Sequence, residues 1–367
     1  MTTRTRTDAP AVPPPTARTR WWTERAGYLA AAGLALYGVL ALGWSLTGRG
    51  YPFGPNDPVG ESSLLRMLPA DVGAPVIAAV ALITAVVAFA MAGESAVRPT
   101  GVRRLLLLAY AWTIVAVLLV VVPDVTVLAF AGYAPILILN IPFGWLEVDY
   151  AELFNWPLIN KCAAVVGGLL LVRTVLTWQL RTGGGCVSCG RKATDAAGIS
   201  AESAARWGRW AAWTAALIPV IYAATRFAWL AGIPLGISTE MLQDMQGTGQ
   251  VWSGAGLAAF GVVGGVLTLG LTQRWGEIFP RWMVGLAGRR VPVMLAVVPA
   301  TFVAFAVAAA GIGFVSSPQF WGLLVESPGG FAPILLWPVW AVALGAATLA
   351  YYLRRRGACA RCSPPSR

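Results

Sequence analysis

The sequence predicts an all-α integral membrane protein with about eight transmembrane helices, arranged as two parallel four-helix repeats with both termini in the cytoplasm. Hydrophobic residues make up 57% of the 367 residues and charged residues only 12%, whereas soluble domains are roughly 45–50% apolar and about 25% charged. Apolar runs of about 20 residues, long enough to cross a hydrocarbon layer about 30 Å thick, recur along the chain. Basic residues gather in alternate connections between these runs, as they do in cytoplasmic loops.

The chain begins with a polar segment, residues 1–20, which is rich in Arg, Thr and Pro and has no apolar periodicity. Such a segment cannot bury enough apolar surface to offset the conformational entropy lost on folding. We therefore expect a disordered cytoplasmic tail.

Eight apolar runs follow, and each has the length of one membrane crossing. They cover residues 26–47, 73–93, 104–123, 158–180, 210–231, 251–272, 293–315 and 331–352. Because the number of crossings is even, the chain ends on the side of the membrane from which the first crossing starts.

The charges between the runs indicate which side each connection occupies. Arginines gather in the tail, in residues 98–104, 181–209 and 274–290, and after residue 353. The intervening connections hold most of the acids. Because cytoplasmic loops are enriched in Lys and Arg, the arginine-rich side is the cytoplasm, and we expect a multi-pass protein of the plasma membrane.

Residues 125–145 are apolar enough for a ninth crossing, but they contain Pro135 and Pro142, which we expect to break a helix. A ninth crossing here would place every later arginine cluster outside the cell. We therefore predict a re-entrant or interfacial segment on the outer face, whose unpaired backbone groups are covered by protein.

Two halves of the chain share a pattern that indicates duplication. Tyr37 and Trp44 have the same spacing as Tyr222 and Trp229, and each half ends in Cys-x-x-Cys. The first repeat covers residues 21–192 and the second covers residues 206–367. Residues 193–205 form a cytoplasmic linker between them. Since each repeat crosses the membrane an even number of times, a pseudo-two-fold axis along the membrane normal would relate them.

Four cysteines end the two repeats on the same side of the membrane, namely Cys186, Cys189, Cys359 and Cys362. Two Cys-x-x-Cys pairs that converge can hold zinc in a closed tetrahedral site. The reducing cytoplasm argues against a permanent disulfide. We expect a structural zinc ion that clamps the two halves, while a redox-active thiol pair and unliganded cysteines remain alternatives.

A second group of candidate residues lies on the outer side, where Glu147, Asp149 and Glu152 are close in sequence. Paired carboxylates can act as general acid and base, or bind a hard cation through oxygen. A solvated amphipathic loop would have the same composition, so that alternative stays open.

Arg226 lies within the fifth apolar run, where a charge is costly and is a functional hypothesis by default. Its side chain can reach the membrane interface. Alternatively, it pairs with Asp124 or Glu147 across an outward-facing cavity and holds an anionic or lipid headgroup there.

Several classes of function are excluded by what the sequence lacks. The chain has no histidine, which removes Ser-His-Asp catalysis, HExxH zinc chemistry and histidine proton relays. It also has no P-loop or GxGxxG motif, so we expect no nucleotide partner. The net charge of +11 reports membrane topology, and we expect no nucleic-acid partner.

The WPLIN stretch at 156–160, the IPLGIS stretch at 233–238 and the paired Cys-x-x-Cys ends resemble a group of uncharacterised multi-pass membrane proteins from actinobacteria. The resemblance covers most of residues 20–365. It implies a multi-pass helical fold, no established activity and no catalytic residues.

Three function classes are compatible with these features. A duplicated bundle with a central axis suits a transporter or permease-like subunit, because parallel repeats form pathways at their interface. A non-catalytic scaffold would bind a protein partner at the basic cytoplasmic face. A membrane-embedded enzyme would use Glu147, Asp149 and Glu152 on a lipid or isoprenoid substrate, so whether the chain is an enzyme stays open.

Overall fold

The structure is a computed structural model of the chain, and it describes residues 17–93, 99–144, 148–187, 190, 201–281, 283 and 285–356. Throughout these ranges the regular structure is helical and no β-strand forms, although an isolated bridge pairs Ile278 with Arg290. The all-α prediction is confirmed for this part of the chain.

Nine helices within the described ranges are long and apolar enough to cross a membrane, one more than the eight expected. They are α1 (Ala17–Thr47), α2 (Ala70–Ala92), α3 (Gly101–Ala116) with its π-helical extension η3 (Val117–Val121), α4 (Val125–Phe143), α6 (Trp156–Thr182), α7 (Ala201–Leu230), α9 (Gln250–Gly270), α10 (Val293–Ser316) and α13 (Trp337–Arg355). The chain is therefore a multi-pass membrane protein.

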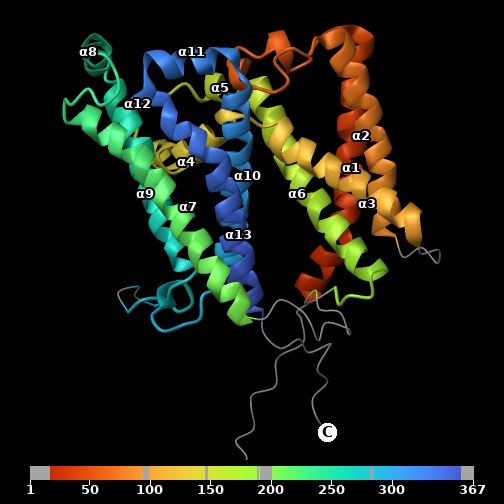
Figure 1. Cartoon of the computed structure of the whole chain (residues 1–367). Helices are drawn as coiled ribbons and strands as arrows, with labels where there is room; N and C mark the ends of the chain where they lie inside the picture. Colours follow the sequence, from red (N-terminus) through yellow and green to blue (C-terminus); the bar gives the residue numbers. More distant parts are fainter. Residues whose placement is uncertain are drawn as a thin grey trace, which may run out of the picture.

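Shorter helical elements connect the long helices. They are α5 (Tyr150–Leu153), α8 (Thr239–Gly247), α11 (Pro318–Glu326), α12 (Pro328–Phe331), η1 (Gly54–Asn56), η2 (Gly60–Ser62), η5 (Arg274–Gly276) and η6 (Ala332–Leu336). In Figure 1, α8 and α11 lie at the end of the molecule opposite to the start of α1.

Two of the expected boundaries differ from the structure. Helix α1 begins at Ala17, so the last part of the expected tail, residues 17–20, is helical. Helix α7 begins at Ala201, so residues 201–205 of the expected linker are helical as well. In both places the helix continues beyond its apolar run, since helices need not end at the membrane surface.

Helix α4 is uninterrupted, and the prediction that Pro135 and Pro142 break this segment is wrong. Its N-terminus is capped by Asp124, whose side chain accepts a hydrogen bond from the Thr126 backbone N–H at 3.0 Å. Its C-terminus is closed by Gly144, which adopts the left-handed conformation at φ 62°. In an apolar surrounding, backbone N–H and C=O groups must be satisfied by hydrogen bonds within the protein. A continuous helix satisfies most of them, although each proline removes one hydrogen bond.

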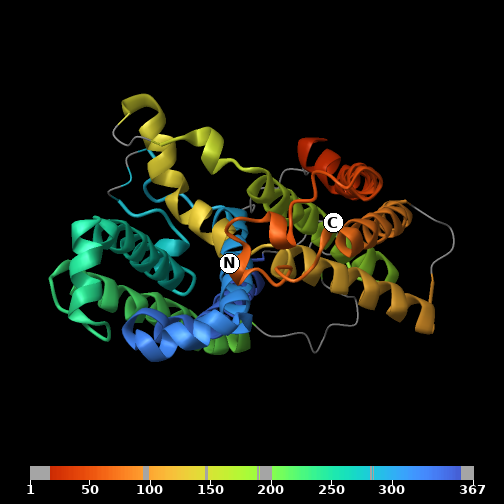
Figure 2. The same ribbon diagram turned by 90° about the horizontal axis from the view of Figure 1, so that it is seen from above.

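The axis of α4 runs across the axes of the other long helices. Figure 1 shows α4 nearly end-on, whereas the view from above shows it along its length (Figure 2). Helix α1 begins at the same end of the molecule at which α13 stops (Figure 1).

The two halves of the bundle show the same packing order. In the first half, α1 packs on α2 and on α6, and α3 packs on α6. In the second half, α7 packs on α9 and on α13, and α10 packs on α13. Helix α10 also packs on α4 and η3, and it thereby joins the halves.

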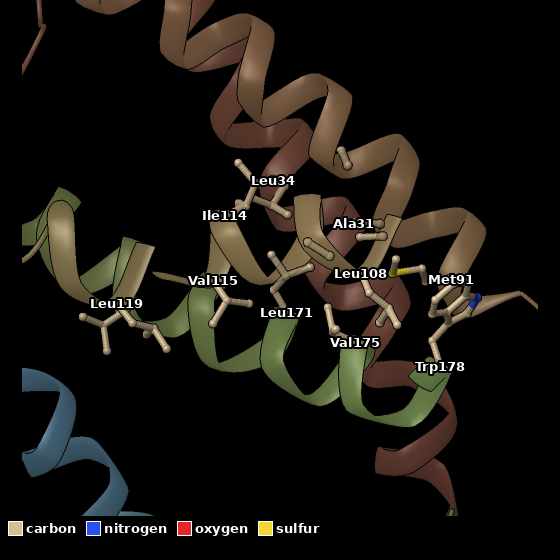
Figure 3. Close-up of a cluster of buried hydrophobic side chains, with 14 of the residues drawn as sticks. Ala31, Leu34, Met91, Leu108, Ile114, Val115, Leu119, Leu171, Val175 and Trp178 are labelled. Carbon is tan, nitrogen blue, oxygen red and sulfur yellow. The ribbon is translucent and has the colours of Figure 1, made fainter. Parts of the chain in front are cut away.

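Each half has its own core of buried apolar side chains. In the first half, Leu34, Leu108, Leu171 and Trp178 from α1, α3 and α6 meet in one cluster (Figure 3). The core of the second half is richer in alanine, and Tyr351 is its largest buried side chain. Small residues let helices approach closely, which favours packing within a bilayer.

Large apolar side chains remain exposed on the helix surfaces. Leu36 on α1, Val86 on α2 and Val342 on α13 are each at least 70% exposed. Soluble proteins rarely expose apolar surface on this scale, so these faces are suited to contact with lipid.

Candidate functional site

A cavity of about 580 Å³ lies among α4, α5, the start of α6 and the loop that follows η1. Its acidic lining consists of Asp57, Asp149 and Glu152, and its basic residue is Lys161. Aromatic side chains of α4 also line it, together with several aliphatic side chains. We call it the α4–α6 cavity. Three carboxylates and one ammonium give the described lining a formal charge of −2.

The start of α6 places Lys161 in this cavity. Asn155 caps the helix by accepting a hydrogen bond from the Leu158 backbone N–H at 2.9 Å. Pro157 stands in the first turn, where its missing N–H is not needed. Lys161 follows in the second turn, and its side chain points inward with 1% of its surface exposed.

An aromatic cluster holds the loop that carries Asp57. The ring of Tyr51 packs edge-on against Trp44 and Phe53. Trp156 of α6 donates from its ring nitrogen to the Gly50 carbonyl at 2.7 Å. Burial raises the pKa of Tyr51 to about 12. The loop is thus fixed against both α1 and α6.

Lys161 forms a buried ionic cluster with two aspartates. Its Nζ lies 2.5 Å from Asp124 Oδ2 and 2.6 Å from Asp57 Oδ2. The side chains of Asp124 and Asp57 are 0% and 3% exposed. Charged groups away from water are expensive unless paired, and within membrane proteins they commonly mark ion or substrate pathways. We call these three residues the Asp–Lys–Asp cluster.

The two aspartates of the cluster are not equally satisfied. Asp124 Oδ1 accepts hydrogen bonds from the Thr126 backbone N–H and hydroxyl, and Oδ2 accepts one from Lys161. Asp57 Oδ1 accepts one from the Val59 backbone N–H at 3.2 Å. Asp57 Oδ2 forms an ion pair with Lys161 Nζ at 2.6 Å, and no other described residue donates a hydrogen bond to it.

The structure brings most of the acids expected from the sequence to one place. Asp149 and Glu152 line the α4–α6 cavity, and Asp124 lies directly behind it. Glu147 lies outside the described residues.

Arg226 is not part of this site, and the expected pairing with Asp124 is not formed, because Asp124 pairs with Lys161. The guanidinium of Arg226 stacks over the rings of Tyr222 and Trp229 at 4.2 and 4.4 Å. It donates to the Gly330 carbonyl at 3.1 Å. Arg226 therefore links α7 to α12 in the second half.

Lys161 and Asp57 were not predicted as site residues. Lys161 is one of the few basic residues near the outer connections. The signal that could have found it is its position inside the apolar run 158–180, where an ionisable residue needs a partner. Asp57 gave no such signal, since it lies in a polar loop.

Three of the four cysteines expected to bind zinc, Cys189, Cys359 and Cys362, lie outside the described residues, and Cys186 is partly buried. The described residues hold no group of three potential metal ligands. However, a Cβ atom added to Gly190 would lie 4.0 Å from Nη1 of Arg356. Gly190, which follows Cys189 in the sequence, therefore lies near Arg356, which precedes Cys359 by three residues.

A second cavity, of about 430 Å³, lies among α9, α10, α13 and the segment after α9. Its lining is almost wholly apolar and includes Trp275, Phe279, Met283 and Trp340. Among the described residues that line it, none is charged, so it suits an apolar moiety.

Comparison with known proteins adds nothing to these observations. No protein-family model, no curated protein and no solved structure gives a significant match to this chain. The function must therefore be argued from the site itself.

Proposed function

We propose that the chain is a transporter or permease-like subunit that binds a small organic cation in the α4–α6 cavity. The observation that carries this proposal is an acidic cavity with a buried ionic cluster in its wall. A volume of about 580 Å³ lies within the range of roughly 300–1,000 Å³ found for small-molecule sites. The excess of carboxylates favours positively charged solutes over anions.

Eight crossings and two parallel repeats form the framework of this proposal. The matching packing order of the two halves supports the duplication. Two features support an even number of crossings, with α4 lying within the membrane (Figures 1 and 2). Helix α4 runs across the other long helices, and α1 begins at the same end of the molecule at which α13 stops. With the arginine-rich end in the cytoplasm, both termini are cytoplasmic and the cavity faces outward.

Zinc has a separate, structural place in this proposal. Cys186, Cys189, Cys359 and Cys362 would hold it as four thiolates, the donor set of a closed structural site. The approach of Gly190 to Arg356 supports the convergence of the two pairs. Zinc there would join the halves at the cytoplasmic face and take no part in solute binding.

The experiment that tests the solute class measures binding to the purified full chain in lipid nanodiscs. A panel of primary amines, guanidines and quaternary ammonium ions is compared with carboxylates and phosphates of equal size. We expect one or more cations to bind and the anions not to bind. A bound cation is then tested for uptake into proteoliposomes.

Paired variants make this experiment specific to the cavity. Asp149→Asn/Glu152→Gln removes two lining carboxylates and should weaken cation binding at least tenfold. Asp71→Asn/Glu240→Gln removes two exposed acids that do not line the cavity, and its binding should match that of the unmodified protein. Equal binding in both variants, or no binding of any cation, would refute the proposal.

The other two classes remain predictions without a structural observation in their favour. A scaffold that binds a protein at the basic face should co-purify with one stoichiometric partner. An enzyme that acts on a lipid or isoprenoid should lose turnover specifically in Glu147→Gln or Asp149→Asn.

A further inference from the structure

The apolar cavity of the second half lies in the gap between two long helices. Helix α9 packs mainly on α7, and α10 packs mainly on α13 and on α4. The space that remains between α9 and α10 is the cavity of about 430 Å³. Protein interiors contain few voids larger than a water molecule, and large apolar cavities bind apolar molecules. A gap of this size is therefore suited to an apolar ligand.

The cavity opens towards the outer, apolar surface of the helix bundle. Leu267 of α9 and Leu295 of α10 line it, and they are 60% and 58% exposed. The surface beside them is also apolar, since Val263 and Val298 are 55% and 57% exposed. An acyl chain of the bilayer can thus enter the cavity from the side without leaving an apolar surrounding.

The connection between α9 and α10, residues 271–292, lines the cavity at the end of the molecule at which α13 stops (Figure 1). We call it the α9–α10 loop. Arg354 of α13 donates a hydrogen bond to the Leu271 carbonyl at 2.5 Å. Arg355 of α13 donates one to the Val291 carbonyl at 2.8 Å. Both ends of the loop are therefore fastened to α13.

The α9–α10 loop is strongly basic. Glu277 is its one acid, and it pairs with Arg354 of α13 at 3.1 Å. The loop also contains four exposed arginines, namely Arg274, Arg281, Arg289 and Arg290. The loop consequently attracts anions to the end of the apolar cavity.

Two of these arginines are direct neighbours of cavity residues in the sequence. Arg281 follows Pro280, which lines the cavity. Arg290 precedes Val291, which also lines it. A guanidinium group binds phosphate oxygens through two parallel hydrogen bonds, and basic pockets between transmembrane helices bind anionic lipid headgroups. The apolar cavity and its arginines match the two parts of an anionic phospholipid.

We propose that this cavity binds an anionic phospholipid, with one acyl chain between α9 and α10 and the phosphate at the arginines of the α9–α10 loop. The lipid comes from the leaflet at the end of the molecule at which α13 stops. Among the described residues, the two cavities share none in their linings. The lipid site therefore does not depend on the proposed function.

Native mass spectrometry of the purified full chain tests the lipid class. The delipidated protein is mixed with phosphatidylglycerol or with phosphatidylcholine that carries the same acyl chains. We expect one phosphatidylglycerol to stay bound per chain, and phosphatidylcholine to bind at least tenfold more weakly because it has no net negative charge. Equal retention of the two lipids would overturn the proposal.

A matched pair of glycine variants tests the position of the acyl chain. Gly264 and Gly256 both lie on α9, and a Cβ atom at either meets nothing within 4 Å. Of the two, Gly264 lines the cavity. Gly264→Phe should weaken phosphatidylglycerol binding at least tenfold, whereas Gly256→Phe should leave it unchanged. Unchanged binding in Gly264→Phe would overturn the proposal.

If Gly264→Phe does not fold, Ala300→Leu fills the same cavity from α10 and has the same expected result. Thermal unfolding of each variant is measured in parallel. Unchanged phosphatidylglycerol binding in folded Ala300→Leu would again overturn the proposal.

A second matched pair tests the headgroup. Arg281→Gln/Arg290→Gln should lower phosphatidylglycerol binding to the level of phosphatidylcholine. Arg206→Gln/Arg209→Gln removes two exposed arginines of α7 that do not line the cavity, and it should bind phosphatidylglycerol like the unmodified protein. Equal binding in both variants would overturn the headgroup position. Oleate that binds as tightly as phosphatidylglycerol would also overturn the proposal, because it would assign the cavity to a free fatty acid.

Discussion

At the scale of single residues, Lys161 holds the two buried aspartates of the site together. It is 1% exposed, and its ammonium faces oxygens of Asp57, Asp124 and Thr126, which come from two different segments. Its removal leaves two buried carboxylates without a cation. That situation differs from the loss of one aspartate, after which a neutral pair remains.

Lys161→Met should therefore destabilise the protein far more than Asp57→Asn. Breaking a buried ion pair by removal of one partner costs about 3–5 kcal/mol, and here both aspartates lose their cation. Thermal unfolding of the two variants in the same detergent checks this expectation. A decrease in Tm for Asp57→Asn equal to that for Lys161→Met would contradict the charge count.

Tyr51 gives a second prediction, which concerns pH. Burial raises its pKa from 10.0 to about 12, so the folded state holds the phenol proton more tightly than the unfolded state. This contribution to stability is fully present below pH 10.0 and is lost as the pH rises towards about 12. The difference in Tm between the unmodified protein and Tyr51→Phe should decrease over that interval. A constant difference would show that Tyr51 does not titrate in this way.

At the scale of elements, α10 and α4 both contact the two halves. Gly313 of α10 determines how closely this helix approaches η2. A Cβ atom on Gly313 would lie 2.2 Å from the Ser62 carbonyl oxygen, which is far inside contact distance. The η2 turn follows directly after the loop that carries Asp57. The close contact between α10 and η2 therefore helps to hold the loop that carries Asp57 in place.

Gly313→Ala should push η2 away from α10 and lower the unfolding free energy by about 1–3 kcal/mol, as overpacking commonly does. Gly345→Ala is the matched control, because a Cβ there meets nothing within 4 Å. We expect the control to keep or slightly raise Tm, since alanine favours helix over glycine. Equal Tm values for the two variants would contradict the close approach.

The elements also show what the sequence could and could not predict. Apolar runs predict the long helices well, because membrane thickness fixes their length. An apolar run does not reveal the orientation of its helix, so the sequence did not show that α4 lies across the other long helices. Lys161 and its partners were not predicted as a group, because positions 57, 124 and 161 are far apart and only the fold brings them together.

At the scale of the whole molecule, the direction of α4 decides on which side residue 148 lies. In a variant without native cysteines, Val148→Cys should react with a membrane-impermeant maleimide added outside, as Met67→Cys should. Arg274→Cys should react only after permeabilisation. Labelling of Val148→Cys only after permeabilisation would mean that α4 crosses the membrane.

Zinc content tests how the halves are joined. We expect about one zinc ion per purified chain, bound by four cysteines, and its loss in Cys186→Ser/Cys189→Ser. Cys162→Ser serves as the control, because Cys162 packs against the first core and should not affect zinc. No zinc in the unmodified protein would remove the clamp and favour the redox-active or unliganded alternative.

The placement of α4 has a mechanical consequence. This helix contacts α6 in the first half and both α9 and α10 in the second, and it also forms one wall of the acidic cavity. Helix α4 therefore bridges the two halves. If the halves rotate relative to each other, α4 must rotate too, and the cavity wall that it forms moves with it. The angle between the halves and the width of the cavity would then change together, so that a ligand that fits only one cavity width would favour one angle between the halves.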